Sequence, residues 1–564
     1  MNVNNLKYIK MQRLIIPTLL FLLNLGITNS QWVSNYWGSS TGDMNILNAR
    51  GMAVAIDRQR NCIVTGYIYN AETNNDIMVI KYGEEGDTIW TRTYSGSGNS
   101  EDKAWGIVVD SDNNIYITGT ATVAGRSYDL IVMKYNKHGV LKWVKTWGAT
   151  SGEREDMGLA IALDDDEDNV YVTGYCTNND GYRDLILQKY TTNNGTLKFT
   201  KKQDGPENMD SEGHGIAVDE NGRIYVTGYT TLENQQKNII TIKFNSHGSK
   251  QWQRQYNGSA NGDDEAFGIA VDDNNNAYVT GYLTTNNNTD AVLLRYNSNG
   301  SLNWAETYNG EGGSSEDKAW GIVVDANRNI VYITGQTSSV SNGLDYLTIK
   351  YKTNGNERWV KTYNGPGNGD DVANAIALMN SNKIIVTGAS WGINENYDYA
   401  TVKFNGNGSI NNVYRYSMTS NSNDIAKDVE VSSNSGNNIY VTGYSELIIE
   451  GSNPSSAATT VMILSKDDEE TVNSVTPTKF NLYQNYPNPF NPSTTIKFDI
   501  SNTANVKLVI YDMLGRVVDV LVNQDLAAGS YSIVYTNKNL SSGIYFYELA
   551  SGDFKTIKKM TLVK

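Results

Sequence analysis

Short apolar segments recur along most of the chain, and turn-forming residues separate them. One segment in every repeat ends in Val-Thr-Gly or Ile-Thr-Gly, and the glycines that close it lie 53 to 55 residues apart. These glycines are Gly66, Gly119, Gly174, Gly228, Gly281, Gly335, Gly388 and Gly443. Eight copies at this spacing predict one repeat architecture, in which each unit buries its apolar face against the next.

Each unit predicts four short strands. They are of the types GIAVD, IYVTG, IVMKYN and WVKTW, and Asp, Asn and Gly in the connections indicate tight hairpin turns. Four antiparallel strands in each of eight units predict an all-β protein built as a β-propeller. The small residues of the first strand suit a crowded central channel, and the Trp and Tyr of the fourth strand should pack between blades.

The two ends of the repeat region complement each other. Residues 32–36 read as a fourth strand with no earlier strands before it, and the eighth unit ends after its third strand, near ATTVMIL. The N-terminal strand should therefore complete the last blade, which would remove free sheet edges. The prediction is a single eight-bladed β-propeller over residues 31–466.

The repeated unit D-x-A-x-G-I-A-V-D…N-x-Y-V-T-G-Y…K-Y-N-x-x-G…W resembles the SBBP-type bacterial β-propeller repeat. This resemblance implies the fold and an extracellular bacterial setting. The family name implies seven blades, whereas this sequence contains eight units. No activity is implied, because propellers carry many unrelated functions.

The first thirty residues have the order of a secretory signal. Lys7, Lys10 and Arg13 precede the apolar run LIIPTLLFLLNLGI, and TNS then precedes Gln31. The apolar run is shorter than the roughly 20 residues that a membrane-spanning helix needs. We expect residues 1–30 to be removed and the mature chain to contain no transmembrane segment.

A polar linker is predicted over residues 467–478, and a small Ig-like β-sandwich over residues 479–564. The motifs YPNPFNPSTTI, IYDMLGRVV, SGIYFYEL and KKMTLVK resemble the type A sorting domain of type IX secretion substrates. The resemblance implies the type IX secretion machinery as a partner of residues 479–564, and a secreted protein that is extracellular or attached to the outer-membrane surface. It places the sorting motif at Tyr486, Pro487, Asn488, Pro489, Phe490, Asn491, Pro492, Lys559 and Met560. An ordinary adhesion sandwich is the alternative.

Charge and composition exclude several classes of function. The net charge of −15 and the absence of a Lys/Arg block argue against nucleic acid as a partner. Three histidines and two cysteines, Cys62 and Cys176, offer little material for a histidine-based triad or a His-ligated metal. We expect no metal and no cofactor.

A carboxylate recurs just before the first strand of six units. These residues are Asp102, Asp156, Asp264, Asp317, Asp371 and Asp424. The loops that carry them should gather at one mouth of the channel. If the side chains point inward, they form an incomplete acidic ring that could attract a cation or bind sugar hydroxyls. Alternatively, each aspartate caps its own loop.

Three residues further on, the repeat varies, and the position holds Trp105, His214, Phe267 and Trp320 in four of the units. Aromatic rings beside carboxylates are typical of carbohydrate binding, because rings stack on sugar faces. Packing between blades is the alternative.

We therefore predict a binding or scaffolding module for an extracellular glycan or protein. We rank this function above the second hypothesis, a secreted polysaccharide-degrading enzyme of the glycoside hydrolase or lyase type. Glycoside hydrolysis would need two mouth carboxylates about 5 to 9.5 Å apart.

Overall fold

The structure is a computed structural model that describes residues 30–36, 48–463 and 479–562, with short internal gaps. It separates into two compact units, one over residues 25–478 and one that contains residues 479–564. The predicted signal peptide, apart from Ser30, and the predicted linker lie outside the described residues. Each unit is described by itself.

Seven antiparallel sheets of the larger unit take four strands each in chain order. The first four are β2 (Ala49–Ile56), β3 (Cys62–Asn70), β4 (Asn74–Tyr82), β5 (Thr88–Tyr94); β6 (Lys103–Val109), β7 (Ile115–Thr122), β8 (Tyr128–Tyr135), β9 (Leu141–Trp147); β10 (Asp156–Leu163), β11 (Asn169–Thr177), β12 (Arg183–Thr191), β13 (Leu197–Gln203); β14 (Ser211–Val218), β15 (Ile224–Thr231), β16 (Lys237–Phe244), β17 (Lys250–Tyr256).

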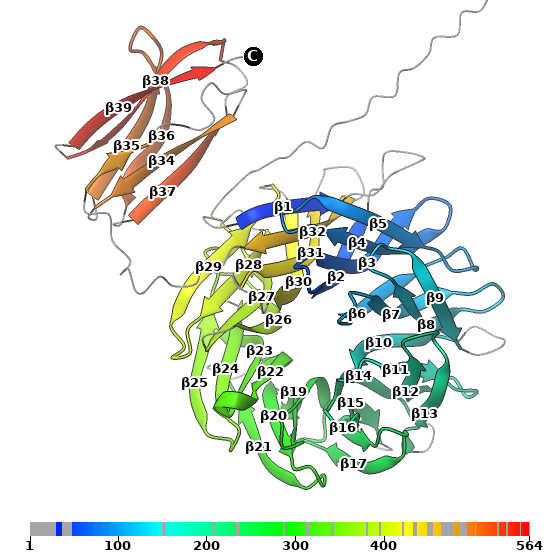
Figure 1. Ribbon diagram of the computed structural model, residues 1–564. Helices are drawn as coiled ribbons and strands as arrows, with labels where there is room; N and C mark the ends of the chain where they lie inside the picture. The colour runs from blue at the N-terminus through cyan, green and yellow to red at the C-terminus, as the bar shows by residue number, and fades with distance from the viewer. Residues whose placement is uncertain are drawn as a thin grey trace, which may run out of the picture. The chain divides into compact units, whose positions relative to one another are not determined.

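The next three sheets continue the same order. They are β18 (Glu265–Val271), β19 (Ala277–Thr285), β20 (Asn288–Tyr296), β21 (Leu302–Tyr308); β22 (Lys318–Asp325), β23 (Ile330–Ser339), β24 (Gly343–Lys352), β25 (Glu357–Tyr363); β26 (Asp371–Met379), β27 (Lys383–Trp391), β28 (Tyr397–Phe404), β29 (Ile410–Tyr416). A 3₁₀ turn, η2 (Ala326–Arg328), joins β22 to β23. Figure 1 shows these sheets arranged around a central opening, with the first strand of each sheet innermost.

The remaining sheet of this unit joins the two ends of the repeat region. Its order is β1 (Ser30–Tyr36), β32 (Ser455–Ile463), β31 (Ile439–Leu447) and β30 (Ser422–Val431). Strand β1 pairs antiparallel with β32, with Val33 opposite Val461. The N-terminal strand therefore occupies the outer position that a fourth strand fills elsewhere, as the sequence predicted.

The hairpin between the first and second strands follows from its Asp-x-x-x-Asn sequence. In one sheet, an oxygen of Asp110 accepts backbone N–H bonds from Asp112 at 3.0 Å and Asn114 at 2.7 Å. Asn113 takes the left-handed backbone conformation, with φ of 64°. This Asx-type turn satisfies backbone donors locally.

Tryptophan side chains of the outer strands tie neighbouring sheets together. The indole N–H of Trp90 donates to the carbonyl of Lys137 at 3.2 Å, in the next sheet. Trp32 of β1 makes the same contact with the carbonyl of Glu84 at 2.8 Å. Because both indoles are 8% exposed, these contacts combine a hydrogen bond with a large buried apolar area. The last and first sheets are joined in the same way as five other pairs of neighbouring sheets.

The smaller unit contains two antiparallel sheets. One is β33 (Asn481–Leu482), β34 (Ser493–Ile500) and β37 (Gly529–Thr536); the other is β36 (Val517–Leu526), β35 (Ala504–Tyr511), β38 (Gly543–Ser551) and β39 (Phe554–Leu562). Residues from both sheets, including Phe498 and Tyr547, share one buried cluster. Lys559 is exposed on β39, whereas Met560 beside it is fully buried. The predicted sorting residues 486–492 lie outside the described residues.

Within the described part of the chain, no helix is long and apolar enough to span a membrane.

Candidate binding site at one end of the channel

In the larger unit, the strand of each sheet that follows the loop aspartate position carries a β-bulge at the same place. The register with the second strand skips one residue there, as between Ala266 and Gly268. The skipped residues are Met52, Trp105, Leu159, His214, Phe267, Trp320, Asn374 and Lys427. A bulge re-aims one side chain without ending the sheet. The bulge is therefore a position at which the sequence varies around the repeat and the backbone departs from regular pairing.

Three bulge residues form a continuous aromatic cluster, which we call the aromatic collar and define as His214, Phe267 and Trp320. The rings of His214 and Phe267 stack with centroids 5.2 Å apart, and Phe267 meets Trp320 edge-on at 4.9 Å. All three side chains are half-buried. They come from strands β14, β18 and β22 of three adjacent sheets, so their rings pack between blades and remain partly accessible.

Trp105 lies apart from the collar. Its ring contacts Tyr67 of the preceding sheet, with centroids 6.4 Å apart. The ammonium of Lys103 lies 5.4 Å from the centroid of the same tyrosine. The sequence grouped Trp105 with His214, Phe267 and Trp320, but in the structure Trp105 is not part of their cluster.

A carboxylate beside the collar is held in its charged form. Glu212 accepts hydrogen bonds from Arg183 and Tyr229 at 2.7 Å each, and His214 Nε2 lies 3.3 Å from its other oxygen. Burial opposes ionisation of Glu212, but hydrogen bonds from His214, Tyr229 and Arg183 outweigh it and lower the pKa to about 2. Nδ1 of His214 lies 3.1 Å from the carbonyl of Ala266, which fixes the ring against the next sheet.

Sequence reasoning missed Glu212. The available signal was local: Ser211 stands where six other units have aspartate, and the carboxylate follows one residue later. Position 212 varies around the repeat, so only the structure shows that this glutamate contacts a collar residue.

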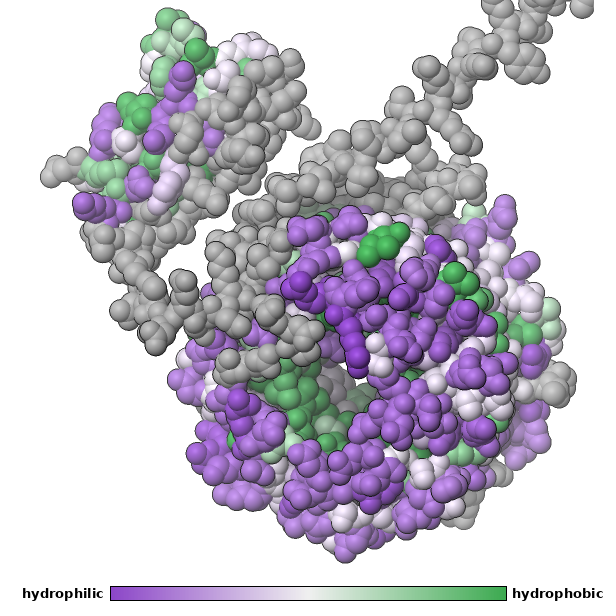
Figure 2. All heavy atoms as spheres, viewed as in Figure 1, coloured by the Kyte–Doolittle hydropathy of each residue, from purple (hydrophilic) through white to green (hydrophobic). Residues whose placement is uncertain are grey.

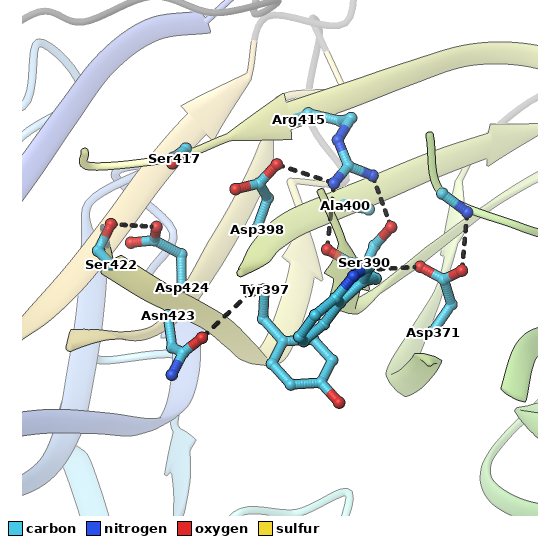
Figure 3. A network of polar contacts seen from close by, with 12 residues as sticks. Asp371, Ser390, Tyr397, Asp398, Ala400, Arg415, Ser417, Ser422, Asn423 and Asp424 are labelled. Carbon is cyan, nitrogen blue, oxygen red and sulfur yellow. Dashed lines mark hydrogen bonds and ion pairs between the residues drawn. The ribbon is translucent and has the colours of Figure 1, made fainter. Parts of the chain in front are cut away.

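The six recurrent aspartates are turned into their own loops. All are between 0 and 1% exposed. Asp102 accepts backbone N–H bonds from Gly96 and Thr122 at 2.6 Å each. Asp264 and Asp371 accept from equivalent residues, and Figure 3 shows the Asp371 contacts. The loop-capping alternative describes these positions, whereas the acidic ring facing a ligand is not observed.

Burial disfavours the charged form of these carboxylates. It raises the pKa of Asp102 to about 6, against the opposing effect of its two backbone hydrogen bonds. Asp424 is more strongly affected, and burial raises its pKa to about 7 despite hydrogen bonds from Ser445, Ser422 and Met418. Carboxylates closed off in this way are poorly placed to meet a substrate.

A separate polar network bridges sheets through Arg415 of β29. Its guanidinium contacts a carboxylate oxygen of Asp398 at 2.8 Å and the hydroxyl of Tyr363 at 3.0 Å. Figure 3 shows it between Asp398 and Ser390. Most outer strands have threonine or another uncharged residue at this position, so Arg415 departs from the repeat. Its contacts are all with buried or half-buried groups, which indicates a structural role.

No group of three or more His, Cys, Asp or Glu side chains suited to a metal ion occurs among the described residues.

Family models match both units of the chain. Residues 484–563 match the secretion system C-terminal sorting domain. Residues 205–232 and 251–288 match the β-propeller repeat called SBBP, and residues 278–303 and 380–412 match a β-propeller domain of unknown function. The chain therefore carries SBBP-type propeller repeats and a type IX sorting domain. The sorting domain marks it as a secreted, cell-surface protein, as the sequence predicted.

A curated relative is an uncharacterized WD repeat-containing protein of Acanthamoeba polyphaga mimivirus, 23% identical over 60% of this chain and 29% of that protein. The chain thus spans less than a third of the length of this relative.

Solved structures give only distant likenesses. PorZ, a type IX secretion surface component of Porphyromonas gingivalis, overlaps at 11% identity and a TM-score of 0.34, over 91% of this chain and 75% of PorZ. The quinohemoprotein alcohol dehydrogenase of Comamonas testosteroni overlaps at 10% identity and a TM-score of 0.44, over 81% of this chain and 79% of the enzyme. The polysaccharide lyase Uly1 overlaps at 12% identity and a TM-score of 0.39, over 76% of this chain and 92% of the lyase. These scores are too low to suggest an activity.

Proposed function

We propose that this protein is a cell-surface binding module whose closed, eight-bladed propeller holds an extracellular glycan at the aromatic collar. In this proposal, residues 1–30 are the secretion signal, residues 31–466 the propeller, residues 467–478 the linker and residues 479–564 the domain that the type IX machinery recognises. The sorting residues Tyr486 to Pro492, Lys559 and Met560 would act in export and not in ligand binding.

The observation that carries the proposal is the clustering of rings on adjacent sheets. His214, Phe267 and Trp320 occupy one bulge position in three neighbouring sheets. The corresponding residues of the other sheets include Met52, Leu159 and Asn374, which could not form such a surface. Aromatic faces are suited to sugars, because the rings cover their C–H faces. Glu212 is buried and is engaged by Arg183, Tyr229 and His214, so its part in the proposal is to hold His214 in place.

The recurrent aspartates contribute indirectly in this scheme. By holding backbone N–H groups of the loops at the mouth, Asp264 and Asp317 fix the loops next to Phe267 and Trp320. Rigid loops reduce the entropy that is lost when a ligand binds. Asp102, Asp156, Asp371 and Asp424 would do the same around the rest of the ring. We propose no catalysis by these carboxylates, because they are buried.

The test is a binding assay of the full chain against a panel of soluble polysaccharides, with calorimetry for affinity and a reducing-end assay for cleavage. Phe267→Ala and Trp320→Ala should weaken binding by about tenfold or more, equivalent to about 1.4 kcal/mol. Leu159→Ala is the matched control, because it truncates the same bulge position outside the collar and should leave affinity unchanged. Release of new reducing ends, or equal weakening in all three variants, would contradict the proposal.

A further inference from the structure

The bulge of the closing sheet carries a charge. In β30 the bulge residue is Lys427, whereas the other seven sheets have no lysine, arginine or acid at this position. Figure 2 shows apolar residues on the wall of the central opening, in contrast to the hydrophilic outer surface in that view. Because β30 is the inner strand of its sheet (Figure 1), Lys427 lies on the backbone that lines this opening.

Lys427 has no partner of opposite charge. Among the ion pairs between described residues, none includes it. The acid that follows it, Asp428, is turned to the backbone and accepts N–H bonds from Val54 and Val429 at 2.9 Å each. Burial lowers the pKa of Lys427, and the charge of Arg50 lowers it further. The side chain is half-buried, which leaves part of it accessible to a ligand.

Lys427 shares one tyrosine ring with a second cation. Its ammonium lies 5.9 Å from the ring centroid of Tyr444, and the guanidinium carbon of Arg50 in the neighbouring sheet lies 4.2 Å from the same centroid. Arg50 pairs with Glu446 at 3.0 Å. Its Nε is buried and has no hydrogen-bond acceptor among the described residues. Two cations at this ring are therefore matched by one carboxylate.

The collar sector shows which group the closing sheet lacks. There, the ammonium of Lys237 lies 4.0 Å from the ring centroid of Tyr229. The hydroxyl of Tyr229 donates at 2.7 Å to Glu212, the residue opposite it in the strand register. In the closing sheet, the residue opposite Tyr444 is Ile425. An apolar residue thus stands where the collar sector supplies an acid.

The position of Lys427 links it to the aromatic collar. One sheet separates the bulge of Trp320 from that of Lys427, and the bulge residue of that sheet is Asn374. The side-chain amide of Asn374 donates at 2.6 Å to the carbonyl of Ala426, the residue before Lys427. A saccharide chain that extends from Trp320 across this one sheet therefore meets Lys427.

We infer that the bound glycan is anionic, and that Lys427 and Arg50 hold one of its carboxylate or sulfate groups beside Tyr444. This inference rests on the proposed function and adds the charge of the ligand. A ligand anion supplies the counter-charge that Lys427 lacks, and hydrogen bonds between charged groups are stronger than those between neutral ones. It also favours the charged form of a lysine that burial disfavours.

The experiment is calorimetric titration of the full chain at low ionic strength with hexagalacturonate, and with its methyl ester as a neutral probe of the same length. The acid should bind at least about tenfold more tightly than the ester. Lys427→Met should weaken binding of the acid at least about tenfold and leave binding of the ester unchanged. Methionine is the residue that β2 carries at its own bulge, Met52, so this variant should fold.

Two further variants test whether the missing carboxylate matters. Lys103→Met is the matched control, because Lys103 also lies beside a tyrosine ring but has its own carboxylate, Glu101, at 2.6 Å. It should leave binding of the acid unchanged. Ile425→Glu places an acid opposite Tyr444 and should weaken binding of hexagalacturonate as much as Lys427→Met does.

A sulfated hexasaccharide of κ-carrageenan separates the two kinds of anionic group. Binding that depends on Lys427 for this probe alone would assign the site to a sulfate ester, and for hexagalacturonate alone to a carboxylate. Equal affinity for the acid and its ester, an unchanged Lys427→Met variant, or an equal loss in Lys103→Met would overturn the inference. Absence of saturable binding by either anionic probe would overturn it as well.

The inference and the proposed function fail separately. Phe267→Ala and Trp320→Ala should weaken binding of the acid and the ester alike, whereas Lys427→Met should weaken binding of the acid alone. An ester that binds through the collar as tightly as the acid contradicts the inference and leaves the proposed function standing. Binding of the acid that depends on Lys427 but not on the collar supports the anion site and contradicts the collar.

Discussion

Two regions of the larger unit share one backbone plan: the collar sector, made of β14, β18 and β22, and the closing sheet, made of β30 to β32 with β1. They differ in the positions at which their side chains depart from the repeat. In the collar sector, the departures occupy the bulge, where His214, Phe267 and Trp320 meet. In the closing sheet, they begin at the bulge with Lys427 and continue to Asp428 and Glu430, one and three residues beyond it. Repeated contacts thus build the scaffold, and departures from them identify the candidate sites.

The largest effect on stability is expected at the junction between the closing sheet and the sheet of β2 to β5. Trp32→Ala should lower the free energy of unfolding by about 3 to 5 kcal/mol, because it removes a buried indole and its hydrogen bond across the junction. Trp90→Ala is the matched control, since that indole has the same 8% exposure and an equivalent contact. Denaturant titration should give similar losses. A cost for Trp32→Ala below about 1 kcal/mol would show that β1 does not close the ring.

The loop aspartates provide the next comparison. Asp102→Ala should cost about 2 kcal/mol or more, because it leaves two backbone N–H groups of the mouth loop without partners. Ser211→Ala, in one of the two sheets that lack the aspartate, should cost about 1 kcal/mol, because one hydroxyl contact is lost. Thermal melts of both variants measure the difference. Equal costs would mean that Asp102 does not hold its loop.

Asp424 in the closing sheet and Glu212 in the collar sector should respond to pH in opposite directions. Burial raises the pKa of Asp424 in the closing sheet to about 7. The folded state therefore holds a proton that the unfolded state releases above about pH 4, so this contribution to stability is lost as pH rises towards about 7. Between about pH 4 and pH 7, Asp424→Asn should therefore lose about 1 to 2 kcal/mol less stability than the original chain. Glu212, with a pKa lowered to about 2, contributes stability above about pH 4 that is lost as pH falls towards 2.

Unfolding free energies at several pH values for the original chain, Asp424→Asn and Glu212→Gln test this contrast. If both variants shift the pH profile in the same direction, the electrostatic difference between Asp424 and Glu212 is not as described.

The smallest effect is expected on the exposed face of the C-terminal unit. Lys559→Ala should change stability by less than about 0.5 kcal/mol, whereas Met560→Ala should cost about 2 to 5 kcal/mol, because Met560 is fully buried. Secretion of the two variants by a type IX-competent host separates recognition from folding. Reduced export of Lys559→Ala with unchanged stability would support its place in the sorting motif, and normal export would remove it.

Sequence pattern predicted the repeated part of the fold because each strand type and turn is written again in every unit. The position of β1 beside β32 also followed, since residues 32–36 have a fourth-strand sequence without the preceding strands. Side-chain direction did not follow. With the same local sequence, an aspartate before the first strand can face either the channel or its own loop. Asp102 faces its loop because it accepts hydrogen bonds from the backbone N–H groups of Gly96 and Thr122.

The candidate site was predictable only as a set of positions. Variation at the bulge drew attention to His214, Phe267 and Trp320, but not to their mutual contacts or to Glu212. The two cations at Tyr444 were missed because Arg50 and Lys427 come from opposite ends of the repeat region. Only the closed propeller brings both side chains to the same tyrosine.

Hydrogen exchange of the full chain, with and without a polysaccharide that it binds, tests the central claim most directly. The account predicts that protection is confined to peptides covering residues 211–218, 265–271 and 318–325, the first strands that carry the collar. Peptides of β2, β10 and β26 should exchange as before. Protection spread evenly over all eight first strands, or restricted to the C-terminal unit, would contradict it.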